Sequence, residues 1–230
     1  MHRLTPLAIL TTCALLAGCH DGPLFALKTI NPVYRSQWAD DEKLGPTDAQ
    51  RHEELQRLVA SMPSLSDADQ EYWLAHIEAL LENDKNPEMR TLAIRALAGC
   101  RSQRVLDLCE KQLTDESIKV RMAVCDVLAV RDEARSTELL GTTIGSESNE
   151  DVMMAAIAAV GKHQSPEAAQ ALKASLKSRN PAVRTAAVES LAQCTGKELG
   201  EDPQVWVAYL EGKAVDEQKK SFTRQMRDLF

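Results

Sequence analysis

Four stretches of the chain repeat one pattern of apolar and polar positions: NPEMRTLAIRALA, ESIKVRMAVCDVLA, NEDVMMAAIAAVG and NPAVRTAAVESLA. Alignment on Met89, Val120, Val152 and Val183 gives periods of 31, 32 and 31 residues. In each stretch, apolar and alanine side chains recur at the spacing that places them on one face of an α-helix. Each stretch therefore predicts an amphipathic helix, and the fixed period is typical of a repeat architecture.

A second helix is predicted before each stretch, over residues 68–81, 103–113, 136–144 and 166–176. Ser66 and Ser165 stand where N-caps are favoured, and prolines and glycines occur at the expected helix ends. A period near 31 residues holds two short helices, and one such hairpin cannot bury its own apolar face. We therefore predict an all-α fold, an α-solenoid of about four stacked hairpins over residues 66–195.

Further helices are expected at both ends of this array. Residues 47–62 predict an N-terminal capping helix, with Thr47 as its cap. Residues 203–230 predict C-terminal helices that end in a basic amphipathic segment. That segment either caps the open end of the array, lies on anionic lipid or enters a groove of a partner.

The turn inside each predicted hairpin has a characteristic pair of positions six residues apart. These positions hold Asp84 and Arg90, Asp115 and Arg121, Glu147 and Met153, and Ser178 and Arg184. With this mark the repeats resemble HEAT repeats, specifically the short phycobilisome-lyase-like type. The resemblance implies an architecture more than an activity. It assigns a structural role, tying each inter-helix turn to its neighbour, to Asp84, Arg90, Asp115, Arg121 and Arg184.

The same resemblance implies that the second helix of each hairpin lines a concave face. The side chains expected to point to this face are Thr91, Arg95, Met122, Asp126, Met154, Ala158, Thr185 and Glu189. The row is mixed in charge and partly apolar in its middle, and methionine adapts well at binding surfaces. We interpret it as a groove for a protein or peptide. The alternative is that the methionines are simply packed between helices.

The N-terminus has the features of a secretory signal. A basic residue, a short apolar run and small residues precede Cys19. The last four residues, LAGC, resemble the lipobox of bacterial lipoproteins. That resemblance implies removal of residues 1–18, a thioether link from Cys19 to diacylglycerol, and acylation of the new amine, for example with palmitate. The alternatives are an ordinary signal peptide cut elsewhere, or a buried helix whose cysteine is incidental.

Residues 19–46 would then form a tether and an irregular segment. Its aromatic residues either lie against the first helices or dock on a partner. Several acyl chains give stable membrane anchoring, so we expect a location in the cell envelope outside the cytoplasm. His20, where the inner-membrane retention signal has Asp, favours the outer membrane.

The chemistry of the chain indicates no catalytic or metal site. A formal net charge of −7 argues against nucleic acid as a ligand. The sequence HEELQ at residues 52–56 lacks the second histidine of a zinc-protease motif, and no cysteine pair has zinc spacing. Cys109 and Cys125 fall on the two helices of one hairpin, where they either pair or stay as buried thiols. We expect no cofactor.

These observations favour a non-catalytic, membrane-anchored scaffold or adaptor for an unidentified envelope protein or peptide. The competing interpretation is a lyase-like protein or enzyme subunit that handles a bilin-type chromophore. A peptidoglycan-binding role is a third hypothesis, and no cluster of aromatic residues supports it.

Overall fold

The computed structural model describes residues 45–215, and this part of the chain forms helices and no strands. Its α-helices are α3 (Asp48–Ser61), α4 (Asp67–Asn83), α5 (Pro87–Leu97), α6 (Arg104–Gln112), α7 (Ile118–Leu128), α8 (Ala134–Ser146), α9 (Glu150–Val160), α10 (Pro166–Ala171), α11 (Pro181–Thr195) and α12 (Pro203–Leu210). Two short 3₁₀ helices follow α3 and α10, namely η3 (Met62–Ser64) and η4 (Ser175–Lys177). The predicted all-α fold is confirmed. No helix among the described residues is both long and apolar enough to cross a membrane.

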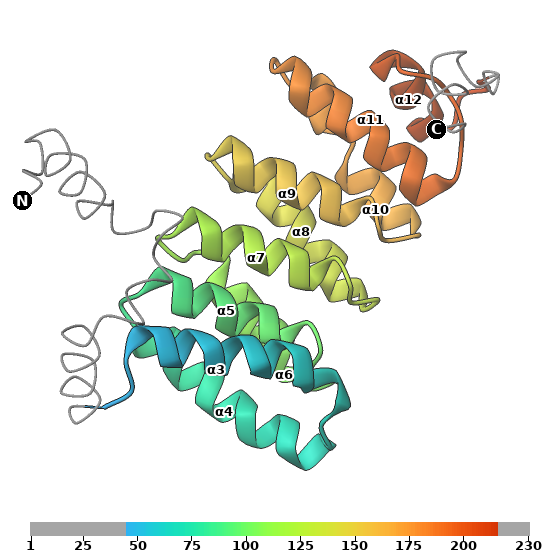
Figure 1. Cartoon of the computed structure of the whole chain (residues 1–230). Helices are drawn as coiled ribbons and strands as arrows, with labels where there is room; N and C mark the ends of the chain where they lie inside the picture. Colours follow the sequence, from blue (N-terminus) through green and yellow to red (C-terminus); the bar gives the residue numbers. More distant parts are fainter. Residues whose placement is uncertain (1–44, 216–230) are drawn as a thin grey trace, which may run out of the picture. The chain divides into compact units, whose positions relative to one another are not determined.

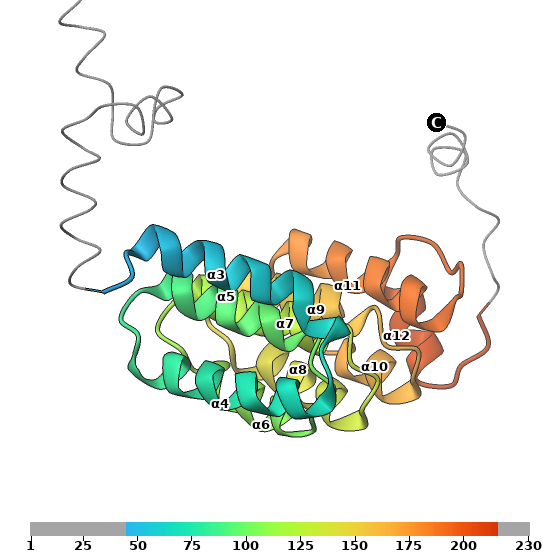
Figure 2. The ribbon, with the colours of Figure 1, turned by 60° about the horizontal axis from the view of Figure 1, so that its bottom comes forward.

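From His52 onward the chain forms one compact unit built from successive helical hairpins. α4 pairs with α5, α6 with α7, α8 with α9, and α10 with α11 (Figure 1). Figure 2 shows two layers, with α5, α7, α9 and α11 side by side in one and their partner helices in the other. The four similar stretches fall on α5, α7, α9 and α11, so they occupy equivalent places. The arrangement is the predicted α-solenoid of helical hairpins.

Helix boundaries follow from local capping chemistry. Ser66 and Ser165 accept hydrogen bonds from backbone N–H groups in the first turns of α4 and α10, as their positions predict. In the shorter N-terminal unit, the Gln50 N–H donates to Thr47 Oγ at 3.3 Å. Gly196 ends α11 with φ of 67°, a left-handed conformation that glycine adopts without strain.

Gly161 follows the end of α9, as its position predicts, and it also allows a close packing contact. Its own backbone is right-handed helical, so the backbone conformation does not require glycine here. A Cβ at this residue would lie 2.9 Å from Ser190 Cβ on α11. A similar contact of 3.2 Å would form between Gly141 on α8 and Ala171 on α10. Small residues therefore let the third and fourth hairpins approach closely in both layers.

The apolar core runs between the two layers through all four hairpins. Leu97, Leu128 and Leu191 stand at equivalent positions near the ends of α5, α7 and α11, and each is fully buried. Beyond the last hairpin, Trp206 on α12 is also fully buried and donates through Nε1 to the Gly200 carbonyl at 2.9 Å. α12 therefore covers the end of the core, as a terminal helix of a repeat array should.

Some predicted boundaries differ from the structure. The first helix of the fourth hairpin, predicted over residues 166–176, ends at Ala171, and the chain continues through a turn into η4. Backbone bonds there span three residues, as from Ser175 N–H to Leu172 O, which is the tighter 3₁₀ pattern. The expectations for residues 1–18, for most of the segment 19–46 and for residues 216–230 lie outside the described part of the chain.

Candidate interaction surface

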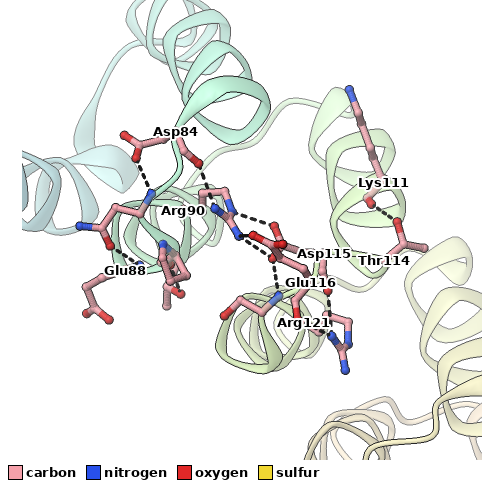
Figure 3. A network of polar contacts seen from close by, with 12 residues as sticks. Asp84, Glu88, Arg90, Lys111, Thr114, Asp115, Glu116 and Arg121 are labelled. Atoms are coloured by element: carbon pink, nitrogen blue, oxygen red, sulfur yellow. Dashed lines mark hydrogen bonds and ion pairs between the residues drawn. The ribbon is translucent and has the colours of Figure 1, made fainter.

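The turn inside the first hairpin is tied to the turn of the second by Arg90. Its Nη1 donates to the backbone carbonyl of Asp84, six residues earlier, at 2.9 Å. Its Nε and Nη2 donate to the two carboxylate oxygens of Asp115 at 2.8 and 2.9 Å. Figure 3 shows this guanidinium between the two turns. The side chains of Arg90 and Asp115 are 6 and 7% exposed, and their hydrogen bond raises the pKa of Arg90.

Arg121 repeats this geometry between the second and third hairpins. Its Nη1 donates to the Asp115 carbonyl at 2.8 Å, while Nε and Nη2 donate to the Glu147 carboxylate at 2.8 and 3.3 Å. Each acid also accepts the backbone N–H two residues later, from Ser117 for Asp115 and from Asn149 for Glu147. We call each such arginine and the acid of the following turn a rung.

The rungs correct the simplest interpretation of the sequence pattern. The acid and the arginine six residues apart do not pair through their side chains, because the arginine uses only the carbonyl of that acid. Its carboxylate partner belongs to the next hairpin. The third rung would join Met153 to Ser178, and neither residue is charged. The two exceptions in the pattern are therefore the two ends of a single missing rung.

The ion pair of the second rung should make stability depend on pH. Burial would raise the pKa of Glu147, but hydrogen bonds from the Asn149 N–H and Arg121 outweigh it and lower that pKa. A carboxyl whose folded pKa is depressed stabilises the fold fully above its unfolded pKa of about 4.3 and loses that contribution as pH falls through the folded pKa.

We therefore expect the free energy of unfolding in urea to fall more between pH 7 and pH 3 for the wild-type chain than for Glu147→Gln. Glu150→Gln is the matched control, because it removes an exposed carboxylate of the same turn that forms no ion pair within residues 45–215. An identical pH dependence in wild type and Glu147→Gln would contradict this role.

A second series of polar contacts joins the links between successive hairpins. Arg101 donates to the carbonyls of Pro63 and Leu65 at 3.1 and 2.9 Å. Arg131, which is buried, donates to the Cys100 carbonyl at 2.8 Å. The buried ring of His163 lies 3.0 Å from the Leu128 carbonyl. These contacts attach each link to the preceding one.

Sequence reasoning missed these link residues. Arg131 and His163 occupy the repeat position that holds Cys100 in the first hairpin and Cys194 in the fourth. The available signal for these contacts was a polar side chain at a repeat position that holds a small, buried cysteine in the other hairpins. His163 Nδ1 also lies 2.7 Å from Thr137 Oγ, so both ring nitrogens have partners and the histidine serves as a structural contact.

The predicted partner-binding face is only partly exposed. Thr91 is buried, and its hydroxyl donates to the Pro87 carbonyl at 2.7 Å, so its assignment to the face was wrong. Its hydroxyl is satisfied within α5 and is not available to a partner. The exposed members of the row are Arg95, Asp126, Ala158, Thr185 and Glu189. Met122 and Met154 are partly buried and pack against the core.

A sequence model of HEAT repeats matches the chain twice, at residues 74–157 and 111–192. The matches overlap and together span just over half of the chain. The chain belongs to the HEAT-repeat family. No curated protein matches the sequence.

Two hollows lie along the turn edge of the HEAT array, which is the edge formed by the turns inside the hairpins. One has a volume of about 480 Å³ and lies between the second and third hairpins, with Arg121, Glu147 and Thr143 in its lining. The other, of about 690 Å³, lies between the first and second hairpins against Arg90 and Glu116. Both are open to solvent, and the arginines in them already hold carboxylates.

The cysteines of the HEAT array are all buried free thiols among the described residues, so Cys109 and Cys125 are not paired. Burial raises the pKa of each of these two thiols to about 12 and that of Cys194 to about 11. A thiol with such a pKa is a poor nucleophile at neutral pH. No group of three metal-ligating side chains occurs within residues 45–215.

Proposed function

We propose that this HEAT-repeat protein is a non-catalytic scaffold or adaptor that is anchored to a membrane of the cell envelope through lipid on Cys19. Its array of second helices would hold another envelope protein or a peptide. Interaction scaffolding is a common use of HEAT repeats. The observation that carries the proposal is the row of exposed side chains on adjacent helices, Arg95 on α5, Asp126 on α7, Ala158 on α9 and Glu189 on α11.

The composition of this row supports a macromolecular ligand. Arg95 and Asp126 lie on one side of an uncharged stretch on α9 and Glu189 lies on the other. In that stretch Met154 is partly buried and Ala158 is exposed. Such a surface offers separate points of contact along four helices rather than one enclosed pocket. Its polar groups would steer and orient a partner, while the methionines would adapt to its shape.

The alternative is a lyase-like protein that handles a bilin-type chromophore, after the phycobilisome-lyase-like repeat type. The array offers little for that role, because no aromatic residue occurs between Trp73 and Trp206 to stack on a tetrapyrrole. A coloured ligand that copurifies with the chain would favour this alternative over the scaffold.

Substitution of Cys19 tests the anchor. We expect the wild-type chain to fractionate with membranes and Cys19→Ala to appear in the soluble fraction, because the thioether cannot form without the thiol. Mass spectrometry of the mature N-terminus should show the added diacylglycerol and acyl mass in wild type. A Cys19→Ala chain that stays membrane-bound, or a wild-type chain without lipid, would refute the anchor.

Crosslinking in native membranes tests the scaffold role. The double variant Asp126→Lys/Glu189→Lys reverses two charges of the exposed row and should lose partners that wild type retains reproducibly. Glu53→Lys, which reverses an exposed charge on α3, is the control and should retain them. Identical partner sets for all three chains would place the binding surface elsewhere.

A further inference from the structure

The turn of the fourth hairpin carries cations and no acid, unlike the turns before it. The residues around the first three turns include many acids, which are Glu82, Asp84, Glu88, Asp115, Glu116, Glu147, Glu150 and Asp151. Between Lys173 and Arg184 the chain has four cations and no acid. The break in the rungs at Met153 and Ser178 coincides with this loss of acidic residues.

Arg184 is held in the same way as the arginines of the two rungs. Its Nη1 donates to the Ser178 carbonyl, six residues earlier, at 2.8 Å, as Arg90 and Arg121 do to their own turns. In those two arginines, Nε and Nη2 hold the carboxylate of the next hairpin. In Arg184 these two donors have no partner among residues 45–215, and the side chain is partly exposed.

Two more cations, Lys177 and Arg179, belong to the same turn as Arg184. Arg184 Nη1 also lies 3.1 Å from the carbonyl of Arg179, and the side chains of Arg179 and Lys177 are exposed. Neither forms an ion pair with an acid in the described part of the chain. Glu211 on the neighbouring segment forms ion pairs with Lys213 at 2.8 Å and Lys173 at 3.6 Å, and Lys177 is close enough to help lower its pKa without pairing with it.

We propose that Lys177, Arg179 and Arg184 form a docking site for a carboxylate-bearing segment of a partner protein. The partner would present an aspartate or glutamate to Nε and Nη2 of Arg184, and Lys177 and Arg179 would attract neighbouring acids. This site lies on the turn edge of the fourth hairpin and is separate from the row on the second helices. It does not depend on the lipid anchor or on the proposed scaffold face.

The two occupied rungs identify the ligand chemistry. Their arginines hold carboxylates in a two-pronged geometry, and each carboxylate also accepts a backbone N–H at the start of a helix. A planar guanidinium fork matches a carboxylate in this way and gives a strong, directional hydrogen-bond pair. The partner segment should therefore be an acidic turn that leads into a helix, such as the chain itself has at residues 146–151.

Fluorescence anisotropy with a labelled peptide tests the proposal. The probe has the sequence of residues 142–154, and its matched control has Glu147 replaced by Gln. The protein is the full chain with Cys19→Ala, so that no lipid is attached. We expect the probe to bind in low salt and to bind about tenfold more weakly to Arg184→Gln, the effect of losing one charge-assisted pair. The Gln peptide should bind wild type as weakly.

Two further variants distinguish loss of the binding site from a folding defect. Lys177→Gln/Arg179→Gln removes exposed side chains without described contacts and should also weaken binding. Arg57→Gln, on an exposed arginine of α3, should leave it unchanged. Absence of probe binding to wild type, or equal binding to Arg184→Gln, would overturn the proposal. Vesicles with 30% phosphatidylglycerol provide a further test. If they bind the chain only when Arg184 is present and the peptide does not bind, the site recognises a membrane and the proposal is overturned.

Discussion

Replacement of Arg90 by Met is expected to lower the free energy of unfolding by about 3 kcal/mol, measured by urea denaturation at pH 7. The substitution removes the counter-ion of Asp115, a carboxylate that is 7% exposed, and leaves that charge buried with only the Ser117 N–H as a close partner. It also frees the Asp84 carbonyl. Breaking one side of a buried pair costs more than the pair itself contributes.

The chain supplies the matched controls for this prediction. Arg90→Met/Asp115→Ser copies the uncharged third rung, Met153 with Ser178, and should recover a large part of the loss because no charge stays buried. Arg57→Met breaks an exposed pair with Glu53 and should change stability by less than about 1 kcal/mol. If Arg90→Met cost no more than Arg57→Met, the rungs would have no part in stability.

Leu128→Ala is expected to destabilise the fold by about 2 to 5 kcal/mol, because it removes a fully buried side chain between the layers and leaves a cavity. The same size of effect is expected for Leu97→Ala and Leu191→Ala at the equivalent positions. Val130→Ala is the control on the same hairpin, since Val130 is 58% exposed. A near-neutral Leu128→Ala would contradict the register of α7 in the core.

The repeat period and the buried face of each second helix could be predicted from the sequence because both depend on local spacing. An apolar residue every third or fourth position defines a helix face without knowledge of its neighbours. Leu97, Leu128 and Leu191 therefore fall where the pattern places them. The early end of α10 could not be predicted, since the residues after Ala171 include no glycine or proline to mark it.

Contacts between hairpins were less predictable because they depend on how far one hairpin is displaced along the next. The sequence places Arg90 six residues after Asp84, but only the stacking brings Asp115 within its reach. The same limit applies to the exposed face. Thr91, Met122 and Thr185 share one repeat position, yet the first is buried, the second partly buried and the third exposed. Exposure there depends on neighbouring residues that the repeat pattern does not specify.

The contact between the third and fourth hairpins differs from the others in a way that bears on motion. Across residues 134–195, all of which the structure describes, no side-chain hydrogen bond or ion pair joins α8 or α9 to α10 or α11. The apolar core and the close approach of small residues, as at Gly161 and Ser190, hold this contact. Such contacts are non-directional, so they oppose separation but hardly oppose sliding. We therefore expect the last hairpin to shift along its neighbour more readily than the hairpins that ion pairs join.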